Sequence, residues 1–290
     1  MINSFKKIAL VSILLTVVAV SGHAQFTQNI IIKNGQKIVF LGDSITAMGT
    51  APAGFAQHVI RGLEANGVNA TMIGAGVGGN TSANMLARMD ADVIANHPDW
   101  MILSCGVNDV WSDLPLEKYK QNMTQIVDKA QAANIKVVIL TATVVGEDPA
   151  TPKNQEMLPY NEFLHQLASQ KKCPLADLNA DVQAAIAAAG GGAQSKRGNI
   201  LTIEGIHMNA LGNHVMALGV LKALGLNADQ LKKAQNSWLD LPHICEVELK
   251  GGLTLRQYAQ LDALAAKQNR PTSELIGELA AKSLPPAPKH

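Results

Sequence analysis

The stretch KIVFLGDSITAMGT, residues 37–50, is the most informative part of the sequence for the fold. In it, a run of apolar residues ends abruptly in a polar turn, as a buried strand of an α/β sheet does. Ile38–Leu41 are four consecutive apolar residues, which is typical of a strand covered on both faces of a sheet. Gly-Asp-Ser follows, so Ser44 is expected at the carboxyl end of a strand, where open α/β sheets bind their ligands. A serine at this point can also simply cap a helical turn. The rest of the chain has to distinguish a nucleophile from a cap.

Short apolar runs alternate with amphipathic stretches from Lys37 onward. The clearest helical pattern is Leu116–Ala133, whose apolar residues recur at helical spacing and which Asn134 can end. Strands that alternate with helices pair in parallel through right-handed crossovers. The sequence therefore predicts a three-layer α/β/α sandwich with its site at the carboxyl ends of the strands. The predicted strands are Ile38–Leu41, Ala70–Ile73, Trp100–Cys105, Lys136–Thr141 and Pro174–Asp177.

The first residues do not belong to this fold. Lys6 and Lys7 precede an apolar run over residues 8–20, and small residues follow before Gln25. This order is typical of a secretory signal peptide, here residues 1–24. An uncleaved membrane anchor is the alternative, but the run is short for spanning a bilayer. We expect a secreted or periplasmic protein that begins at Gln25.

Charge and cysteine usage exclude several function classes. Removal of the signal peptide takes away two lysines and no acids, so the formal net charge changes from +1 to −1. We therefore expect no nucleic-acid partner and, after cleavage, no membrane partner. Cys105 ends an apolar run and is expected to be a buried free thiol, whereas Cys173 and Cys245 could pair. No cysteine or histidine spacing resembles a zinc site, so we expect no metal and no cofactor.

A serine nucleophile needs a neighbouring base, and a base needs a group that orients it. Among the histidines of the mature chain, His207 is the candidate base: it precedes a helix and has a carboxylate three residues before it on a turn, Glu204. This carboxylate can reach back to the imidazole ring. A chance pair on a surface loop is the alternative. The helix that follows is expected to begin at a cap, Asn209, to end at Gly225, and to be apolar along one face, made of Leu211, Val215, Leu218 and the stem of Lys222.

Two further strand ends offer hydrogen-bond donors. Gly79 lies in a glycine-rich turn after the second strand, and Asn108 follows the third. Together with the backbone N–H of Ser44, they provide three donors for an oxyanion. Taken singly, each is also explained as a turn or cap residue. Asp43 and Asp109 are expected to support the loops around Ser44 and Asn108 rather than to act as triad acids.

Four ordered blocks, FLGDSITAMG, GVGGNTSANML, CGVND and EGIHMNALGN, resemble those of the SGNH (GDSL) hydrolase family. The resemblance spans residues 37–225. It implies a flavodoxin-like, mostly parallel five-stranded sheet and ester hydrolysis through an acyl-serine. The family's nucleophile falls on Ser44 and its base on His207, and its oxyanion donors fall on Gly79 and Asn108 beside the Ser44 amide.

One residue departs from the family pattern. The family usually has aspartate three residues before the histidine, where this chain has Glu204. The extra methylene shifts the carboxylate by about 1.5 Å. We interpret Glu204 as the group that orients His207; in the alternative, a backbone carbonyl does so and Glu204 is secondary.

The substrate is expected to be a short-chain acyl ester, acetyl first, on a small molecule or a glycan. The alternatives are a lysophospholipase or thioesterase acting on longer chains, and a non-catalytic carbohydrate-binding relative. The loop Val145–Asn161 is expected to line the pocket, and Trp111 could stack on a sugar or a chain, or lie in the core.

The chain is expected to have three parts: the signal peptide, a hydrolase domain over residues 25–226, and a helical extension over residues 227–290 with a Pro-rich tail. The extension contains two helical patterns around Arg270 and Pro271 and is loosely similar to a ribbon-helix-helix module. We interpret it as a helical hairpin that packs on the main domain or on a partner chain, as in a homodimer.

Overall fold

The computed structural model describes residues 30–192, 199–239 and 255–283. The predicted signal peptide and Cys245 lie outside these ranges. The chain divides into two compact units after Ile244, and each is described here by itself.

The first unit is built on one five-stranded sheet in which every strand is parallel to its neighbours. The strand order is β2-β1-β3-β4-β5. Ile38 of the interior strand β1 pairs with Met72 of β2 and Trp100 of β3. This confirms the predicted sheet, and all five predicted strands are present. Their bounds are β1 Lys37–Gly42, β2 Thr71–Gly76, β3 Trp100–Ser104, β4 Lys136–Leu140 and β5 Leu175–Ala176.

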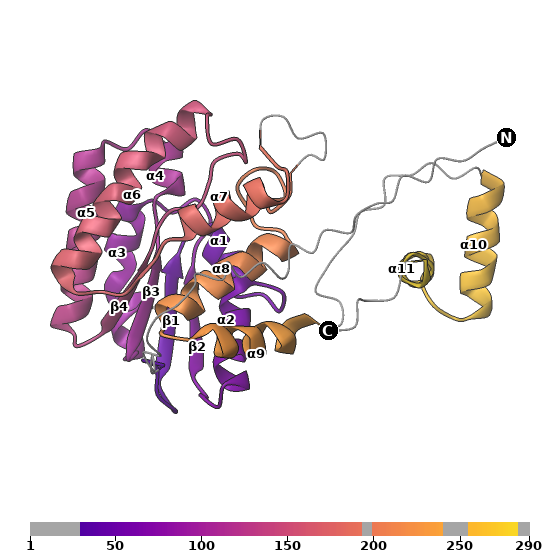
Figure 1. The fold of residues 1–290 in the computed structure, drawn as a ribbon, viewed down its shortest axis with the longest axis horizontal. Coiled ribbons are helices and arrows are strands. Elements are labelled where there is room, and N and C mark those ends of the chain that lie inside the picture. Colours follow the sequence, from indigo (N-terminus) through magenta and orange to yellow (C-terminus); the bar gives the residue numbers. More distant parts are fainter. Residues whose placement is uncertain (1–29, 193–198, 240–254, 284–290) are drawn as a thin grey trace. The chain divides into compact units, whose positions relative to one another are not determined.

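Helices cover both faces of the sheet, which confirms the three-layer sandwich (Figure 1). One layer contains α3, α4, α5 and α6, and the other contains α2, α7, α8 and α9. The bounds in this unit are α1 Ser44–Gly49, α2 Phe55–Ala65, α3 Ser82–Asp92, α4 Val107–Trp111, α5 Leu116–Ala132, α6 Pro152–Lys171, α7 Leu178–Ala188, α8 Ala210–Ala223 and α9 Ala228–Leu239, with a short 3-10 turn η1 at Ile94–Asn96.

The helix predicted from periodicity corresponds closely to α5. Its apolar stripe is fully buried against the sheet, and just beyond it Asn134 adopts the left-handed conformation with a φ of 59°. Asparagine tolerates that conformation better than most residues, which explains why the helix ends here. The buried stripe consists of Tyr119, Met123, Ile126, Val127 and Ala130.

The predicted apolar face of α8 is wrong, although both of its ends are as expected. The Asn209 side chain accepts hydrogen bonds from the N–H groups at the start of α8, and Gly225 follows its end with a φ of 90°. Leu211, however, is 48% exposed and Lys222 is exposed as well. The buried residues of α8 are Gly212, Asn213, Met216, Ala217, Gly219, Val220 and Leu221. A Cβ at Gly219 would lie 2.6 Å from Leu178 of α7. Gly219 therefore lets α8 approach α7 closely, and a pattern of large apolar residues does not detect such a contact.

The expected loop over Val145–Asn161 is shorter in the structure. Residues from Pro152 onward form α6, so only 145–151 of this stretch belong to the connection between β4 and α6. Pro152 fits the first turn of a helix because its missing N–H would be unpaired there anyway. Pro159 lies inside α6. The prolines and polar residues of this stretch favoured a loop, but packing on α5 retains the helix.

The composition change near residue 226 does not coincide with the division between the units. Helix α9 begins just after residue 226 and still packs on α2 of the first unit. Its residue Trp238 is 1% exposed. The second unit contains α10 (Leu255–Lys267) and α11 (Thr272–Lys282), which begins just after Pro271.

Cys105 and Cys173 are free thiols, and Cys105 is buried. In the part of the chain that the structure describes, no helix is long and apolar enough to cross a membrane.

Two histidines, the buried His58 and the half-buried His214, link α2, α8 and α9 through one tryptophan. The His58 ring stacks on Trp238 with centroids 5.0 Å apart, and the His214 ring meets the same indole edge-on, also at 5.0 Å. Burial lowers the pKa of both histidines to about 4, and for His58 the charges of His214 and Arg61 add to this. Both rings are therefore neutral in the folded protein near pH 7.

This cluster predicts a loss of stability on acidification. An unfolded histidine titrates near pH 6.5, so between that pH and about 4 the unfolded state binds more protons and stability falls as the pH drops. We expect His58→Phe, which keeps the ring stack, to reduce this slope by up to about 1.4 kcal/mol per pH unit. Chemical denaturation from pH 7 to 4.5 measures the slope.

The matched control is His97→Asn. His97 is exposed and has a φ of 48°, which asparagine tolerates. The free energy of unfolding of His97→Asn should change with pH as steeply as that of the wild type. Equal slopes for His58→Phe and the wild type would contradict the prediction.

Candidate active site

The candidate site lies at the carboxyl ends of β1, β2 and β3, where Ser44 is the first residue of α1. The turn between β1 and α1 is tight: a Cβ on Gly42 would lie 2.0 Å from the Thr46 hydroxyl, so only glycine fits. Asp43 caps α1 by accepting a hydrogen bond of 2.9 Å from the N–H of Ile45. Strand, glycine and cap together direct Ser44 to the edge of the sheet.

The structure brings Ser44, His207 and Glu204 into one hydrogen-bonded chain. Ser44 Oγ lies 2.8 Å from His207 Nε2. On the other side of the ring, His207 Nδ1 lies 2.5 Å from Glu204 Oε1. The backbone N–H of His207 donates to the same oxygen at 2.9 Å. Glu204 therefore holds both the ring and the backbone of His207, and the turn accommodates the extra methylene.

The electrostatics of this pair favour an ionised glutamate. Burial acts to raise the pKa of Glu204, but the backbone and side-chain hydrogen bonds from His207 outweigh it, and the pKa is lowered. The Glu204 side chain is 48% exposed and that of His207 is 30% exposed. A carboxylate bound to one ring nitrogen fixes which tautomer the histidine adopts. Nε2 is then free to accept the proton of Ser44.

The predicted oxyanion donors lie beside Ser44. A Cβ at Gly78 would lie 3.9 Å from the Cβ of Ser44, so the glycine turn after β2 is adjacent to the serine. Gly79 has a φ of 74°, which favours glycine, and open space lies in front of it. The side-chain amide of Asn108 donates to the carbonyl of Asn80 at 3.1 Å and to Asp43 Oδ2 at 3.3 Å.

Two buried carboxylates connect the loops of the site. Asp43 links α1 to Asn108, and burial raises its pKa to about 6. Asp109 accepts hydrogen bonds from the backbone N–H and hydroxyl of Ser82, at 2.9 and 2.6 Å, and from Cys105 Sγ at 3.3 Å. Burial raises the pKa of Asp109 as well, although its hydrogen bonds with Ser82 and Cys105 oppose this. Asp109 therefore connects β3 and α4 to the start of α3.

Sequence reasoning missed Arg88 of α3, which connects the turn after β1 to the turn after β2. Its guanidinium donates to the carbonyl of Gly42 at 2.8 Å and to Asn80 Oδ1 at 2.7 Å. Its sequence context is that of an ordinary surface charge on a helix, so no local signal indicated it. The exposed large apolar side chains include Val77, Trp111 and Ile203, which lie close in the chain to residues of the site. Trp111 is thus a surface residue at the end of α4, not a core residue.

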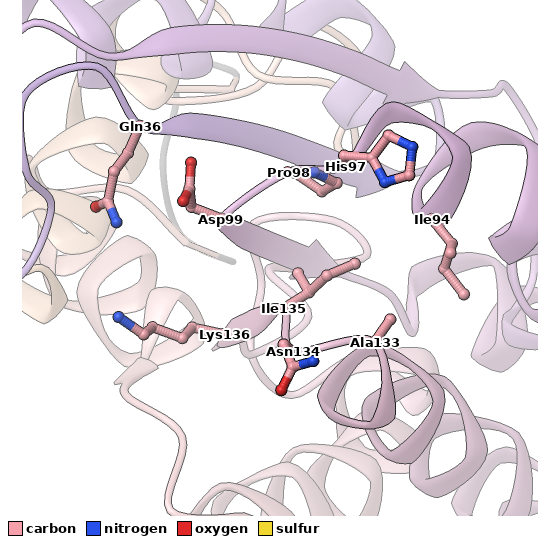
Figure 2. Close-up of a pocket in the computed structure, with 9 residues that line it drawn as sticks. All are labelled: Gln36, Ile94, His97, Pro98, Asp99, Ala133, Asn134, Ile135 and Lys136. Carbon is pink, nitrogen blue, oxygen red and sulfur yellow. The ribbon is translucent and has the colours of Figure 1, made fainter.

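A hollow of about 430 Å³ lies at the opposite edge of the sheet (Figure 2). It is lined by residues at the starts of β1, β3 and β4, far along each strand from Ser44. Two of its polar groups have structural partners: Asp99 accepts from the N–H of Lys37, and Gln36 accepts from the Trp100 indole. It contains no serine or cysteine nucleophile. In the described residues, no group of three or more His, Cys, Asp or Glu side chains could hold a metal ion.

Comparison with known proteins agrees with this geometry. A sequence model of the GDSL-like lipase/acylhydrolase family matches residues 40–215. An acetylxylan esterase of Geobacillus stearothermophilus is 25% identical over 217 residues, which cover 67% of this chain and 96% of that protein. The esterase TesA of Pseudomonas aeruginosa is 29% identical over 107 residues, 36% of this chain and 53% of that protein.

Solved structures show the same fold. The acetyl xylan esterase AlAXEase superposes with a TM-score of 0.60 at 31% identity, covering 64% of this chain and 98% of that one. Axe2, an acetylxylan esterase from Geobacillus stearothermophilus, superposes with a TM-score of 0.60 at 22% identity, covering 68% and 97%.

The hydrogen-bonded chain predicts an activated serine. A fluorophosphonate probe should label Ser44, as located by peptide mass spectrometry, because His207 can take its proton. Ser44→Ala should abolish labelling. Glu204→Gln should slow it by on the order of 10²-fold, because the amide no longer fixes the histidine tautomer.

Ser169→Ala, at an exposed position on α6, is the matched control and should label like the wild type. Labelling at another residue would contradict the assignment of Ser44. Unchanged labelling of Glu204→Gln would show that Ser44 and His207 act without the carboxylate.

Proposed function

The chain belongs to the GDSL-like lipase/acylhydrolase family and is a carboxylic ester hydrolase, and on this premise we propose that it is exported and removes short acyl groups, acetyl first, from carbohydrate esters. The observation that carries the proposal is the chain of hydrogen bonds from Ser44 through His207 to Glu204.

In the proposed mechanism, His207 Nε2 takes the proton of Ser44 Oγ as that oxygen attacks the ester carbonyl carbon. Glu204 stabilises the imidazolium that forms and keeps the ring in place. The proton then passes to the leaving oxygen, the alcohol departs, and an acyl-serine remains. A water molecule gives a proton to His207 and attacks the acyl carbon. His207 then returns that proton to Ser44 Oγ as the bond from Oγ to the acyl carbon breaks, which releases the acid and restores Ser44.

The negative oxygen of each tetrahedral intermediate is received by the N–H groups of Ser44 and Gly79 and by the amide of Asn108. Both Nδ2 hydrogens of Asn108 point at protein acceptors in the structure, at 3.1 Å to Asn80 and 3.3 Å to Asp43. The contact with Asp43 is the longer one, so we infer that the oxyanion replaces it. Asp43 then serves to hold the amide in place before substrate arrives.

Two observations support a short acyl group on a carbohydrate. The relative whose length this chain matches almost completely, at 96%, is an acetylxylan esterase. The exposed Trp111 is 57% accessible and lies three residues after Asn108, where its ring offers a flat apolar face to a sugar.

An acyl-ester panel tests the substrate class. With p-nitrophenyl acetate, butyrate and octanoate, kcat/KM should fall by about tenfold or more from acetate to octanoate, because added methylenes have to fit the site. An acetylated xylo-oligosaccharide should release acetate, and Ser44→Ala should hydrolyse none of these esters above background. A preference for octanoate would favour a lipase or thioesterase. A chain that binds the oligosaccharide without hydrolysing any ester would be a non-catalytic relative.

Export rests on residues 1–24 and is tested separately. When the full chain is produced in a bacterial host, the protein recovered outside the cytoplasm should begin at Gln25, as read by mass spectrometry of the intact protein. Ala24→Tyr should block this cleavage because the site requires a small residue. A full-length chain confined to the cytoplasm would contradict export without affecting the esterase assignment.

A further inference from the structure

A buried carboxylate lies outside the Ser44–His207–Glu204 chain. Glu147, on the connection from β4 to α6, is 8% exposed. Its Oε2 accepts the N–H of Ile200 at 2.6 Å. Its Oε1 accepts the N–H groups of Leu201 and Thr202, both at 2.7 Å, and the Thr202 hydroxyl at 2.8 Å. Both oxygens are therefore bound by one short segment of chain.

That segment is the base of the turn that carries Glu204 and His207. The turn is closed by a hydrogen bond of 2.8 Å from the N–H of Ile203 to the carbonyl of His207 and by a bridge between Thr202 and Met208. These contacts tie the two sides of the turn to each other at residues 202–203 and 207–208. Where its base lies consequently decides where the His207 ring lies.

A second contact links the two loops. The N–H of Gly146 donates to the carbonyl of Gly205 at 2.7 Å. Gly205 has a φ of 103°, and a Cβ there would lie 3.3 Å from the Cα of Gly146. A side chain at position 205 would press on the backbone of Gly146, so this close approach favours glycine at 205. Glu147 and this glycine contact together fix the turn to the end of β4.

We propose that Glu147 is a positioning residue for ester hydrolysis, which holds the 200–209 turn so that His207 Nε2 stays within hydrogen-bond distance of Ser44 Oγ. This inference rests on the proposed function of Ser44, His207 and Glu204. A buried charge is costly unless it is hydrogen-bonded, and here four donors satisfy it. Bonds to an ionised acceptor are shorter and stronger than neutral ones, which suits a role in fixing position.

Glu147→Gln is the direct test, because one carboxylate oxygen becomes an NH₂ group that faces backbone N–H donors. A displacement of about 1 Å at a catalytic group can cost 10²-fold, so we expect kcat for p-nitrophenyl acetate to fall by about 10- to 100-fold. KM should stay within about twofold, because the substrate contacts remain. Glu162→Gln, at an exposed position on α6, is the matched control and should behave like the wild type.

Thr202→Val covers the case in which Glu147→Gln does not fold. It keeps the carboxylate and three of its four hydrogen bonds, so we expect a smaller loss of kcat with an unchanged KM. Circular dichroism confirms folding before each assay. A wild-type kcat in a folded Glu147→Gln or Thr202→Val protein would overturn the proposal.

A double-mutant cycle separates positioning from a general structural effect. If Glu147 acts through the turn, the losses in Glu147→Gln and Glu204→Gln should overlap, and the double variant should lose less than their product. Independent, multiplicative losses would overturn the positioning role. Fluorophosphonate labelling of the wild type keeps the two proposals apart: absence of labelling at Ser44 refutes the proposed function, whereas equal labelling rates of wild type and Glu147→Gln refute only the role of Glu147.

Discussion

The hydrogen bond between Ser44 Oγ and His207 Nε2 joins residues 163 positions apart in the chain, and the rest of the site depends on it. One of its ends is placed by a steric constraint, since the turn after β1 accepts only glycine at position 42. The other end is placed by a turn that belongs to no strand and has to be held by side chains. The sheet brings the two segments to one edge, and local contacts provide the last few ångströms.

Buried carboxylates provide much of that local order. Asp43, Asp109 and Glu147 are each less than a tenth exposed, and each accepts hydrogen bonds from loops that meet at the carboxyl edge of the sheet. The cost of burying a charge makes such groups poor general stabilisers. They suit places where several backbone N–H groups need an acceptor and a loop needs one fixed position. Glu204 differs because it is half-exposed and contacts His207 directly.

The glutamate at position 204 shows how a family pattern tolerates a longer side chain. Its Oε1 contacts both the ring and the backbone N–H of His207, so the added methylene is absorbed within the turn. The turn is closed by its own hydrogen bonds and fixed at its base. Within it, the glutamate carboxylate reaches the imidazole.

The sequence by itself predicted the five strands, the α/β/α layers and the residues Ser44, Gly79, Asn108, Glu204 and His207, because periodicity, turn glycines and strand ends are local features. Tertiary structure decided the rest. Arg88 and Glu147 look like ordinary surface charges in the sequence, and only packing shows that they hold the loops of the site. The buried face of α8 and the stacking of His58 on Trp238 were hidden for the same reason. Such contacts depend on which distant segments meet, and a local pattern contains no information about that.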